Sequence, residues 1–313
     1  MNRRTVLSGV AALPLAACAT VDGAAKRGPL KRGPGVAITV DDFNLADDPM
    51  MSGQARDGVI RQALAAHGVR AAGFVAGQYI DAEVAPRVLH DWSADGHILG
   101  NHTFSHRYYS GADPAAYRAD IRRCEALLAS YRGFRKLFRY PYLAEGKTAE
   151  GRDALRGLLR ADGYRIGHVT IDASDWYYSS RLSGRLKTDP RTDLAPYRQA
   201  YLDHLWDRAT YYDALAQSVF GQSLDHTLLL HHNLTTGLFL GDALAMFKSR
   251  GWRLVDAQTA FAQPEFVRDF QTLPSGQSLV WAAAKASGRY ETQLRYPGED
   301  ERYEAPRLDA LGL

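Results

Sequence analysis

Cysteine is scarce in this chain of 313 residues, which contains only Cys18 and Cys124. This scarcity excludes a disulfide scaffold, and a hydrophobic content of 46% excludes a disordered or collagen-like chain. An excess of one charge is also missing. The net charge is +3, and Arg3 and Arg4 contribute two of those charges within the first 17 residues, which hold no acid. The rest of the chain is so near neutral that it has no general attraction to nucleic acid, and we expect no such partner.

A long hydrophobic run is missing as well. The apolar stretch from Val6 to Ala17 has 12 residues, whereas a membrane-spanning helix needs about 20. A charged start, a short apolar core and a small-residue end are typical of an export signal. The end of this stretch, Leu15 to Cys18, resembles the bacterial lipoprotein cleavage box, and Arg3-Arg4 resembles a twin-arginine signal.

The lipoprotein resemblance implies that Cys18 becomes the lipidated first residue of the mature chain. Ala19 after it favours the outer membrane. We therefore expect an exported protein, anchored in the bacterial envelope by lipid on Cys18 and facing the periplasm. The alternative is an ordinary signal peptide that carries an accidental cysteine. Residues 19–34 are rich in Ala, Gly, Lys, Arg and Pro, which predicts a flexible tether.

The remaining cysteine, Cys124, then has no intramolecular partner. It shares a helical spacing with Tyr117, Ile121 and Leu128, which places all four on the apolar stripe of a helix. The spacing predicts a buried, inert thiol.

From residue 36 onward, short apolar runs alternate with segments of helical periodicity. The predicted strands are 36–40, 71–75, 97–100, 134–139, 165–171, 227–230 and 252–255. The predicted helices are 56–67, 83–94, 114–131, 149–161, 193–219 and 242–250. Such alternation indicates an α/β protein with a parallel sheet covered by helices, either an open doubly wound sheet or a barrel. The polar, glycine-containing residues 176–192 predict a surface loop, and the residues after Pro264 break the alternation.

Polar residues gather directly after the predicted strands, at the end where parallel α/β folds build their sites. These groups are Asp41-Asp42, the run from Asn101 to His106, the run from Arg139 to Tyr142, the run from Asp172 to Trp176, and His231-His232. Each group alone has a plain structural explanation. An aspartate pair often caps a helix or forms a turn, a single arginine is often solvated, and a histidine is often a satisfied interior residue.

His102 and His106 are four residues apart, so a helical turn would place both imidazoles on one side. One carboxylate would complete a metal site with open positions for water and substrate. This donor set suits Zn²⁺ best, with Co²⁺, Ni²⁺ or Fe²⁺ as alternatives. Two histidines at this spacing also occur by chance.

Together these motifs resemble the polysaccharide deacetylase family of carbohydrate esterases, also called the NodB-homology family. The resemblance covers residues 36–256, and the motifs appear in the family's order. They are Thr39-Val40-Asp41-Asp42, the run from Gly96 to His106, Arg139-Tyr140-Pro141-Tyr142, the run from Asp172 to Trp176, and Leu229-Leu230-His231. The resemblance implies a distorted (β/α)₇ barrel over residues 35–263. It leaves 1–18 as the export signal and 264–313 as a C-terminal extension without an assigned role.

The resemblance further implies metal-dependent hydrolysis of N- or O-linked acetyl groups from an envelope or extracellular polysaccharide. Carried over by position, Asp42, His102 and His106 would bind one divalent metal. Trp176 and Leu229 would form the walls of the acetyl pocket. An acetylated polysaccharide or oligosaccharide is then the expected partner.

Five further positions receive catalytic roles from the same resemblance. Asp41 would be the general base and Arg139 would position it. His231 would be the general acid, and Asp175 would raise its pKa. The backbone N–H of Tyr142 would help to stabilise the oxyanion.

Two positions depart from the family pattern. Phe43 stands where glycine or aspartate is usual, which predicts a more apolar first loop and a reshaped sugar subsite. His232 follows His231 where aspartate is common. Two other functions stay open: a non-catalytic carbohydrate-binding lipoprotein on the same fold, and an amide hydrolase acting on a non-sugar substrate.

Overall fold

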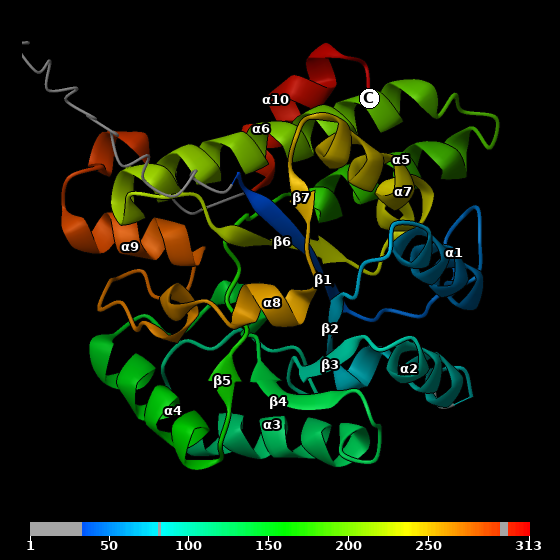
Figure 1. Ribbon diagram of the computed structural model, residues 1–313. Helices are drawn as coiled ribbons and strands as arrows, with labels where there is room; N and C mark the ends of the chain where they lie inside the picture. The colour runs from blue at the N-terminus through cyan, green and yellow to red at the C-terminus, as the bar shows by residue number, and fades with distance from the viewer. Residues whose placement is uncertain (1–32, 81–82, 295–299) are drawn as a thin grey trace, which may run out of the picture. The chain divides into compact units, whose positions relative to one another are not determined.

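The computed structural model describes residues 33–80, 83–294 and 300–313. The export signal, Cys18 and most of the tether lie outside these residues. The described part is built around one sheet of parallel strands (Figure 1). The strands are β1 Gly35–Asp42, β2 Ala72–Val75, β3 Ile98–Asn101, β4 Phe134–Phe138, β5 Arg165–Ile166, β6 Asp225–His231 and β7 Arg253–Leu254.

The order of the strands places β1 between β2 and β6. It runs β5-β4-β3-β2-β1-β6, and β7 also pairs with β1. Asp41 lies opposite His231 on β6, and Asp42 lies opposite Val75 on β2. The strands end at a common edge, and segments far apart in the sequence therefore meet there.

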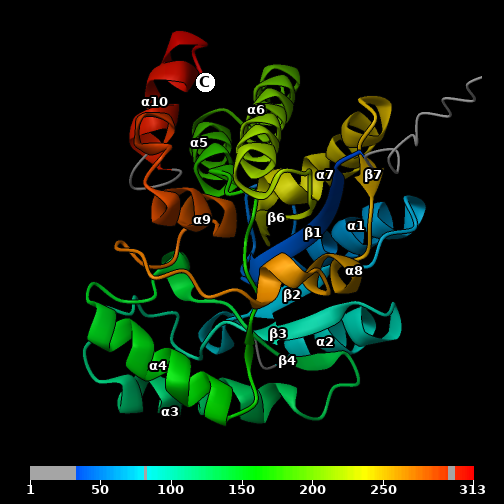
Figure 2. The same cartoon turned by 60° about the vertical axis from the view of Figure 1, so that its left-hand side comes forward.

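The predicted strand 165–171 is wrong beyond its first two residues. After β5 the chain leaves β4 and crosses toward the other end of the sheet, where Ile171 forms a parallel bridge with Leu228 of β6. Gly167 permits this path, because a Cβ there would lie 2.3 Å from the ring of Phe74. The crossing curls the sheet, and the fold is the expected distorted barrel (Figure 2).

The predicted helices are present, with shifted ends. They are α1 Gly53–Ala66, α2 Ala85–Ala94, α3 Pro114–Leu128, α4 Ala149–Ala161, α6 Ala195–Phe220 and α7 Leu234–Ser249, and a short α8 Ala257–Phe261 follows. Side-chain caps fix two of the starts: Ser52 accepts from the N–H of Ala55, and Thr148 from that of Gly151. Cys124 is fully buried on α3 as predicted, and burial raises the pKa of its thiol to about 12.

The predicted loop over residues 176–192 is wrong, because Asp175–Thr188 forms helix α5. Tyr178, Leu182 and Leu186 recur every four residues and bury one face of this helix. The polar residues and Gly184 hide that stripe in the sequence, since they occupy the remaining faces.

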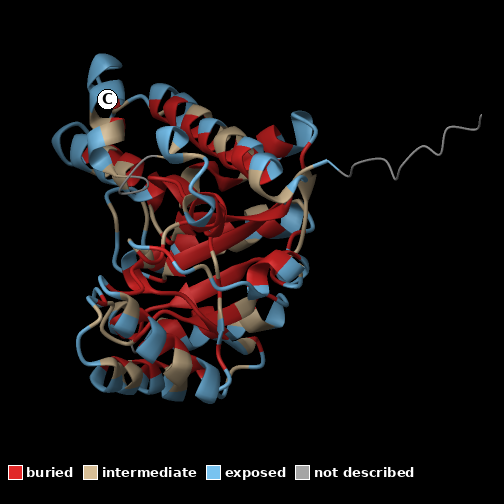
Figure 3. Cartoon of the chain, turned by 90° about the vertical axis from the view of Figure 1, so that its left-hand side faces the viewer, coloured by how far each residue is buried: buried red, intermediate tan, exposed pale blue. Residues whose placement is uncertain are grey.

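The described residues after Pro264 pack onto the same body (Figures 1 and 3). They form the short 3₁₀ turns Pro264–Val267 and Glu291–Gln293 and the helices α9 Leu279–Ser287 and α10 Glu301–Ala310. Val280, Trp281 and Leu308 join the main apolar cluster. Among the described helices, none combines the length and the apolar character that crossing a membrane requires.

Candidate active site

A cavity of about 710 Å³ opens at the carboxyl ends of the strands. Its lining comes from the ends of β1, β3 and β6, the turn after β4, helix α5 and a C-terminal segment. Of the predicted site residues, eight line it: Asp41, Asp42, His102, His106, Tyr142, Trp176, Leu229 and His231. Arg139 and Asp175 are buried, and both contact residues of this lining.

Asp42, His102 and His106 meet on one side of the cavity. One ligand atom from each lies within 4.8 Å of the other two. The Oδ1 atom of Asp42 is 3.0 Å from Nε2 of His106 and 3.4 Å from Nε2 of His102. No other group of three such residues with this geometry occurs in the part of the chain that the structure describes.

The backbone that presents these residues is not helical, so the predicted helical turn is wrong. Thr103 and His106 adopt left-handed φ values of 66° and 49°. The Thr103 hydroxyl accepts a hydrogen bond from the N–H of His106 at 2.9 Å and closes the turn. Asp42 also has a positive φ, 75°. Several residues with left-handed backbone conformation at one place are typical of active sites and ligand-binding sites.

The protonation pattern of this group fits a shared cation. Nδ1 of His102 lies 2.8 Å from the backbone oxygen of Arg139, to which it can only donate. When His102 is neutral, its Nε2 atom therefore carries the lone pair with which histidine ligands commonly bind a metal. The Oδ1 atom of Asp42 is buried and receives no hydrogen bond of good geometry. Burial opposes ionisation of Asp42, but the two imidazoles outweigh it and hold the pKa of this carboxyl well below its usual range.

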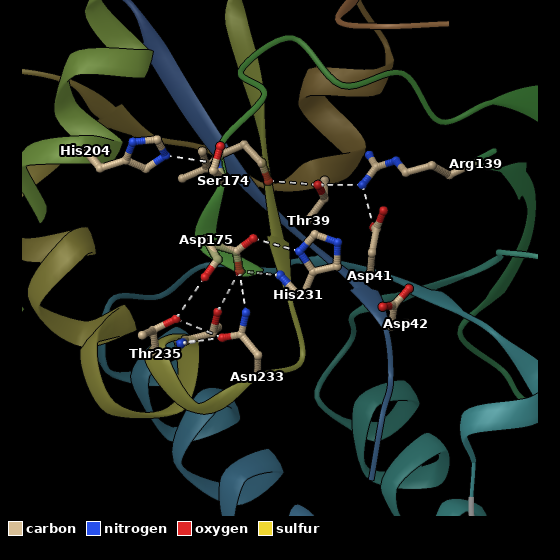
Figure 4. Close-up of polar contacts among 12 residues, drawn as sticks. Thr39, Asp41, Asp42, Arg139, Ser174, Asp175, His204, His231, Asn233 and Thr235 are labelled. Carbon is tan, nitrogen blue, oxygen red and sulfur yellow. Dashed lines mark hydrogen bonds and ion pairs between the residues drawn. The ribbon is translucent and has the colours of Figure 1, made fainter. Parts of the chain in front are cut away.

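Asp41 and Arg139 form a buried ion pair beside the triad (Figure 4). Nη1 of Arg139 lies 2.6 Å from Oδ1 of Asp41, and both side chains are almost fully buried. The guanidinium also donates to the hydroxyl of Thr39 and to the backbone oxygen of Gly167, each at 2.8 Å, and it stacks on Phe74. One oxygen of Asp41 is therefore fixed, and the other lies 3.7 Å from Nε2 of His102.

His231 and Asp175 form a second pair on the opposite side. Nδ1 of His231 lies 2.7 Å from Oδ1 of Asp175, and Oδ2 accepts from the N–H of His231 and from the amide of Asn233, each at 2.8 Å. Figure 4 shows the imidazole between Asp175 and the Asp41-Asp42 pair. Burial lowers the pKa of His231, but Asp175 more than compensates and, with Asp42 and Asp41, raises it to about 10.

The rim of the cavity carries exposed aromatic rings. Trp176 is 41% exposed and Tyr142 is 63% exposed, whereas Leu229 is buried in the wall. Tyr142 has a left-handed φ of 58°, and its ring packs against that of His106. Tyr178, two residues after Trp176, belongs to the apolar core.

The two departures from the family pattern, Phe43 and His232, are both buried side chains. Phe43 is fully buried against Trp92 and the ring of His232, so it does not reshape the cavity. His232 contacts Arg56 and Asp57 of helix α1 through its side chain. The residue beside His231 therefore takes no part in orienting that imidazole, which Asp175 holds.

Sequence motifs do not reveal every residue that lines the cavity. Tyr79, Ser179 and Gln277 lie in segments without a recognisable motif, yet each reaches the cavity. Nδ1 of His106 is 3.5 Å from the hydroxyl of Tyr79. The spacing of buried residues in α5 could have revealed Ser179, since it shares the buried face with Leu182 and Leu186.

Comparison with known proteins agrees with this geometry. Residues 30–165 match the family described as polysaccharide deacetylase. The peptidoglycan-N-acetylglucosamine deacetylase of Bacillus cereus is 24% identical over 202 residues, which are 62% of this chain and 59% of that protein. This chain therefore matches less than two thirds of that relative.

Solved structures share the fold. The chitin deacetylase of Colletotrichum lindemuthianum has a TM-score of 0.51 and 24% identity, covering 76% of this chain and 92% of that one. A polysaccharide deacetylase of Bacillus cereus has a TM-score of 0.50 and 18% identity, covering 72% and 92%. The match over residues 30–165 and the shared fold agree with the resemblance of the sequence motifs to the NodB-homology group of polysaccharide deacetylases.

Proposed function

We propose that the protein is a metal-dependent hydrolase that removes acetyl groups from a polysaccharide or oligosaccharide of the cell envelope. One observation supports this proposal: three side chains that could bind a cation lie between two oriented acid–base pairs in a single cavity. A protein that only binds sugar has no use for a buried Asp41–Arg139 pair or for an imidazole held by Asp175. The family match over residues 30–165 supports acetylated sugar polymers as the substrate class.

Asp42, His102 and His106 would hold the metal. One carboxylate and two imidazoles suit Zn²⁺ best, with Co²⁺, Ni²⁺ or Fe²⁺ as alternatives. A divalent cation held there would supply Lewis-acid chemistry: it would lower the pKa of a water molecule to near 7 and would stabilise negative charge on an acetyl oxygen. Nε2 of His102 would be the metal ligand. Nδ1 of the same ring donates to the Arg139 carbonyl, and this hydrogen bond fixes the tautomer.

The residues around that site divide the proton transfers. Asp41, with one oxygen held by Arg139, takes the proton of the attacking water as the general base. His231 enters as imidazolium because Asp175 raises its pKa, and it donates a proton to the departing sugar nitrogen or oxygen. The C–N or C–O bond breaks, and acetate and the free sugar group are released. The N–H of Tyr142 would donate to the oxyanion, and Trp176 and Leu229 would enclose the methyl group.

N-acetylglucosamine polymers are the first substrates to test. The named relatives act on peptidoglycan N-acetylglucosamine and on chitin, which share the acetamido group. Protonation of an amine leaving group is also the task for which an imidazolium at this position is most needed. The exposed rings of Trp176 and Tyr142 offer stacking faces for sugar units beyond the acetylated one.

The experiment that tests the function is a substrate panel. Acetate release would be measured from penta-N-acetylchitopentaose, peptidoglycan fragments, acetylated xylan and small acylated amines, with added Zn²⁺ and with a chelator. We expect turnover of at least one acetylated sugar, abolished by chelation and restored by metal. Turnover of the small amines alone would replace the proposal by a non-sugar amide hydrolase. Sugar binding without any acetate release would replace it by a binding protein.

Export and anchoring form a separate proposal that rests on the sequence alone. The segment 1–18 would be the signal, Cys18 the lipidated residue, 19–34 the tether, 35–263 the catalytic barrel and 264–313 its extension. Mass spectrometry of the membrane fraction should find a lipidated mature N-terminus at Cys18. A Cys18→Ser variant should leave that fraction, and retention of the variant there would contradict lipid anchoring.

A further inference from the structure

The C-terminal residues 269–279, here called the strap, reach the cavity at Gln277. Three arginines of helix α4 hold the strap, two through its backbone and one through a side chain. Arg152 donates to the carbonyl of Thr272 at 3.1 Å and Arg156 to that of Phe270 at 3.2 Å, while Arg160 pairs with Asp269 at 2.9 Å. At the far end the hydroxyl of Ser278 donates to the backbone oxygen of Thr170 at 2.8 Å. The strap is therefore fixed at both ends.

Between these anchors the strap clasps the turn that carries Tyr142. Ala144 and Gly276 form an antiparallel bridge, and Gln277 donates its N–H to the carbonyl of Leu143 at 3.2 Å. A Cβ at Gly276 would lie 1.4 Å from that same oxygen, so only glycine permits the approach. Behind the clasp the hydroxyl of Ser275 donates to the carbonyl of Gly146 at 3.0 Å.

Both sides of the clasp store backbone strain. Tyr142 and Leu143 have φ values of 58° and 50°, and Gln277 opposite them has 59°. Residues other than glycine, asparagine and aspartate rarely adopt this region, so the surrounding structure must hold all three in place. All three line the cavity. A conformation that glycine would adopt without strain is thus occupied by an amide side chain in the lining of the cavity.

We propose that Gln277 contacts the sugar units of the substrate and determines specificity, and that the strap positions both it and the Tyr142 turn. This inference rests on the proposed deacetylase function. An amide both donates and accepts hydrogen bonds, which suits the hydroxyl and acetamido groups of a neutral sugar. The cavity of about 710 Å³ has room for a sugar unit as well as an acetyl group.

The decisive variant is Gln277→Gly, which removes the amide and also relieves the positive φ. We expect the melting temperature to stay equal or rise. The KM for penta-N-acetylchitopentaose should increase at least fivefold with kcat within twofold. The KM for 4-nitrophenyl acetate, which has no sugar, should stay within twofold. Gln199→Ala, an exposed amide on helix α6, is the matched control and should change nothing. An unchanged KM for the pentasaccharide in Gln277→Gly overturns the assignment.

The clasp is tested by Gly276→Ala, whose added methyl group must displace the Tyr142 turn. We expect kcat to fall at least tenfold while Zn²⁺ affinity, measured by titration with the metal alone, stays within twofold. Ser275→Ala is the second variant, for use if Gly276→Ala does not fold. It removes one clasp hydrogen bond without a clash and should lower kcat about two- to threefold. Wild-type kcat in both variants, or in Ser275→Ala when Gly276→Ala does not fold, overturns the positioning role.

Calorimetric binding separates the two proposals. If the wild type binds the pentasaccharide but releases no acetate, the deacetylase function fails, and a weaker affinity in Gln277→Gly still supports the contact. Equal affinities in the two proteins reject the contact alone. Neither binding nor hydrolysis by the wild type rejects both.

Discussion

Nε2 of His204 accepts a hydrogen bond from the backbone N–H of Ser174 at 2.9 Å, on the residue that precedes Asp175 (Figure 4). Its Nδ1 lies 3.2 Å from Glu304 of helix α10, and both side chains are buried. Helix α6 and the C-terminal helix thus fix the first turn of α5. Because Asp175 holds the imidazole of His231, this remote pair positions the proposed general acid.

The first prediction concerns that link. His204→Ala removes the acceptor for the Ser174 N–H, and a small displacement of Asp175 should lower kcat about tenfold with KM within twofold. His204→Gln can supply an oxygen acceptor and should restore most of the activity. Steady-state kinetics on an acetylated oligosaccharide measures both. Equal loss in the two variants would mean that His204 only fills space.

The Asp175–His231 pair predicts a leaving-group effect. Asp175→Asn removes the charge that offsets burial, so the pKa of His231 should fall and the imidazole should be neutral at pH 7.5. Deacetylation of an N-acetyl sugar should slow about a hundredfold, since general acid catalysis contributes about 10²–10⁴. 4-nitrophenyl acetate, whose leaving group needs no proton, should be affected far less. Equal loss on both substrates would argue against acid catalysis by His231.

The same pair predicts a pH dependence in the metal-free protein. The folded pKa of about 10 lies above the ordinary value of 6.5. The contribution of protonated His231 to the free energy of unfolding is therefore complete below pH 6.5 and is lost as the pH rises toward 10. NMR of labelled histidines should show His231 still protonated at pH 8, and the His231→Asn spectrum assigns the signal. A neutral His231 at pH 8 would contradict the geometry.

Metal binding should stabilise the fold. At a Zn²⁺ concentration about 100-fold above the dissociation constant, linkage adds about 2.7 kcal/mol to the free energy of unfolding. Thermal unfolding with and without Zn²⁺ should show this gain in the wild type and in His90→Ala, an exposed histidine outside the site. His106→Ala should lose it. A similar zinc shift in His106→Ala would place the metal elsewhere.

Asp41→Asn should separate metal binding from catalysis. The triad is intact, so Zn²⁺ affinity should persist, while loss of the base should lower kcat about a hundredfold or more. Stability should also drop, by about 3 kcal/mol, because the buried guanidinium of Arg139 loses its ionic partner. Zinc titration, kinetics and urea unfolding report the three effects. Wild-type turnover in this variant would reject Asp41 as the base.

The location of the candidate site was largely predictable from sequence, because short motifs follow strands whose ends meet at one edge of a parallel sheet. Asp41 and Asp42 end β1, and His231 ends β6 directly opposite Asp41. Periodicity likewise located the helices and the burial of Cys124. Local patterns predict these features because apolar spacing and strand ends are local properties.

Other features depended on contacts between distant segments. The left-handed turns at Asp42, Thr103 and His106 have no residue signature, so the histidine spacing suggested a helical turn that does not exist. Phe43 looked like part of the cavity but packs in the core.

By itself, the sequence determined the class of fold, the order of the motifs and the donor types of the candidate metal site. Tertiary structure alone decided how α5 closes one wall and how the C-terminal strap brings Gln277 to the other. The physical reason is that Gln277 reaches the cavity through bonds to Leu143, a partner 134 positions away in the chain. Periodicity records which face of a segment is buried and carries no information about what that face meets.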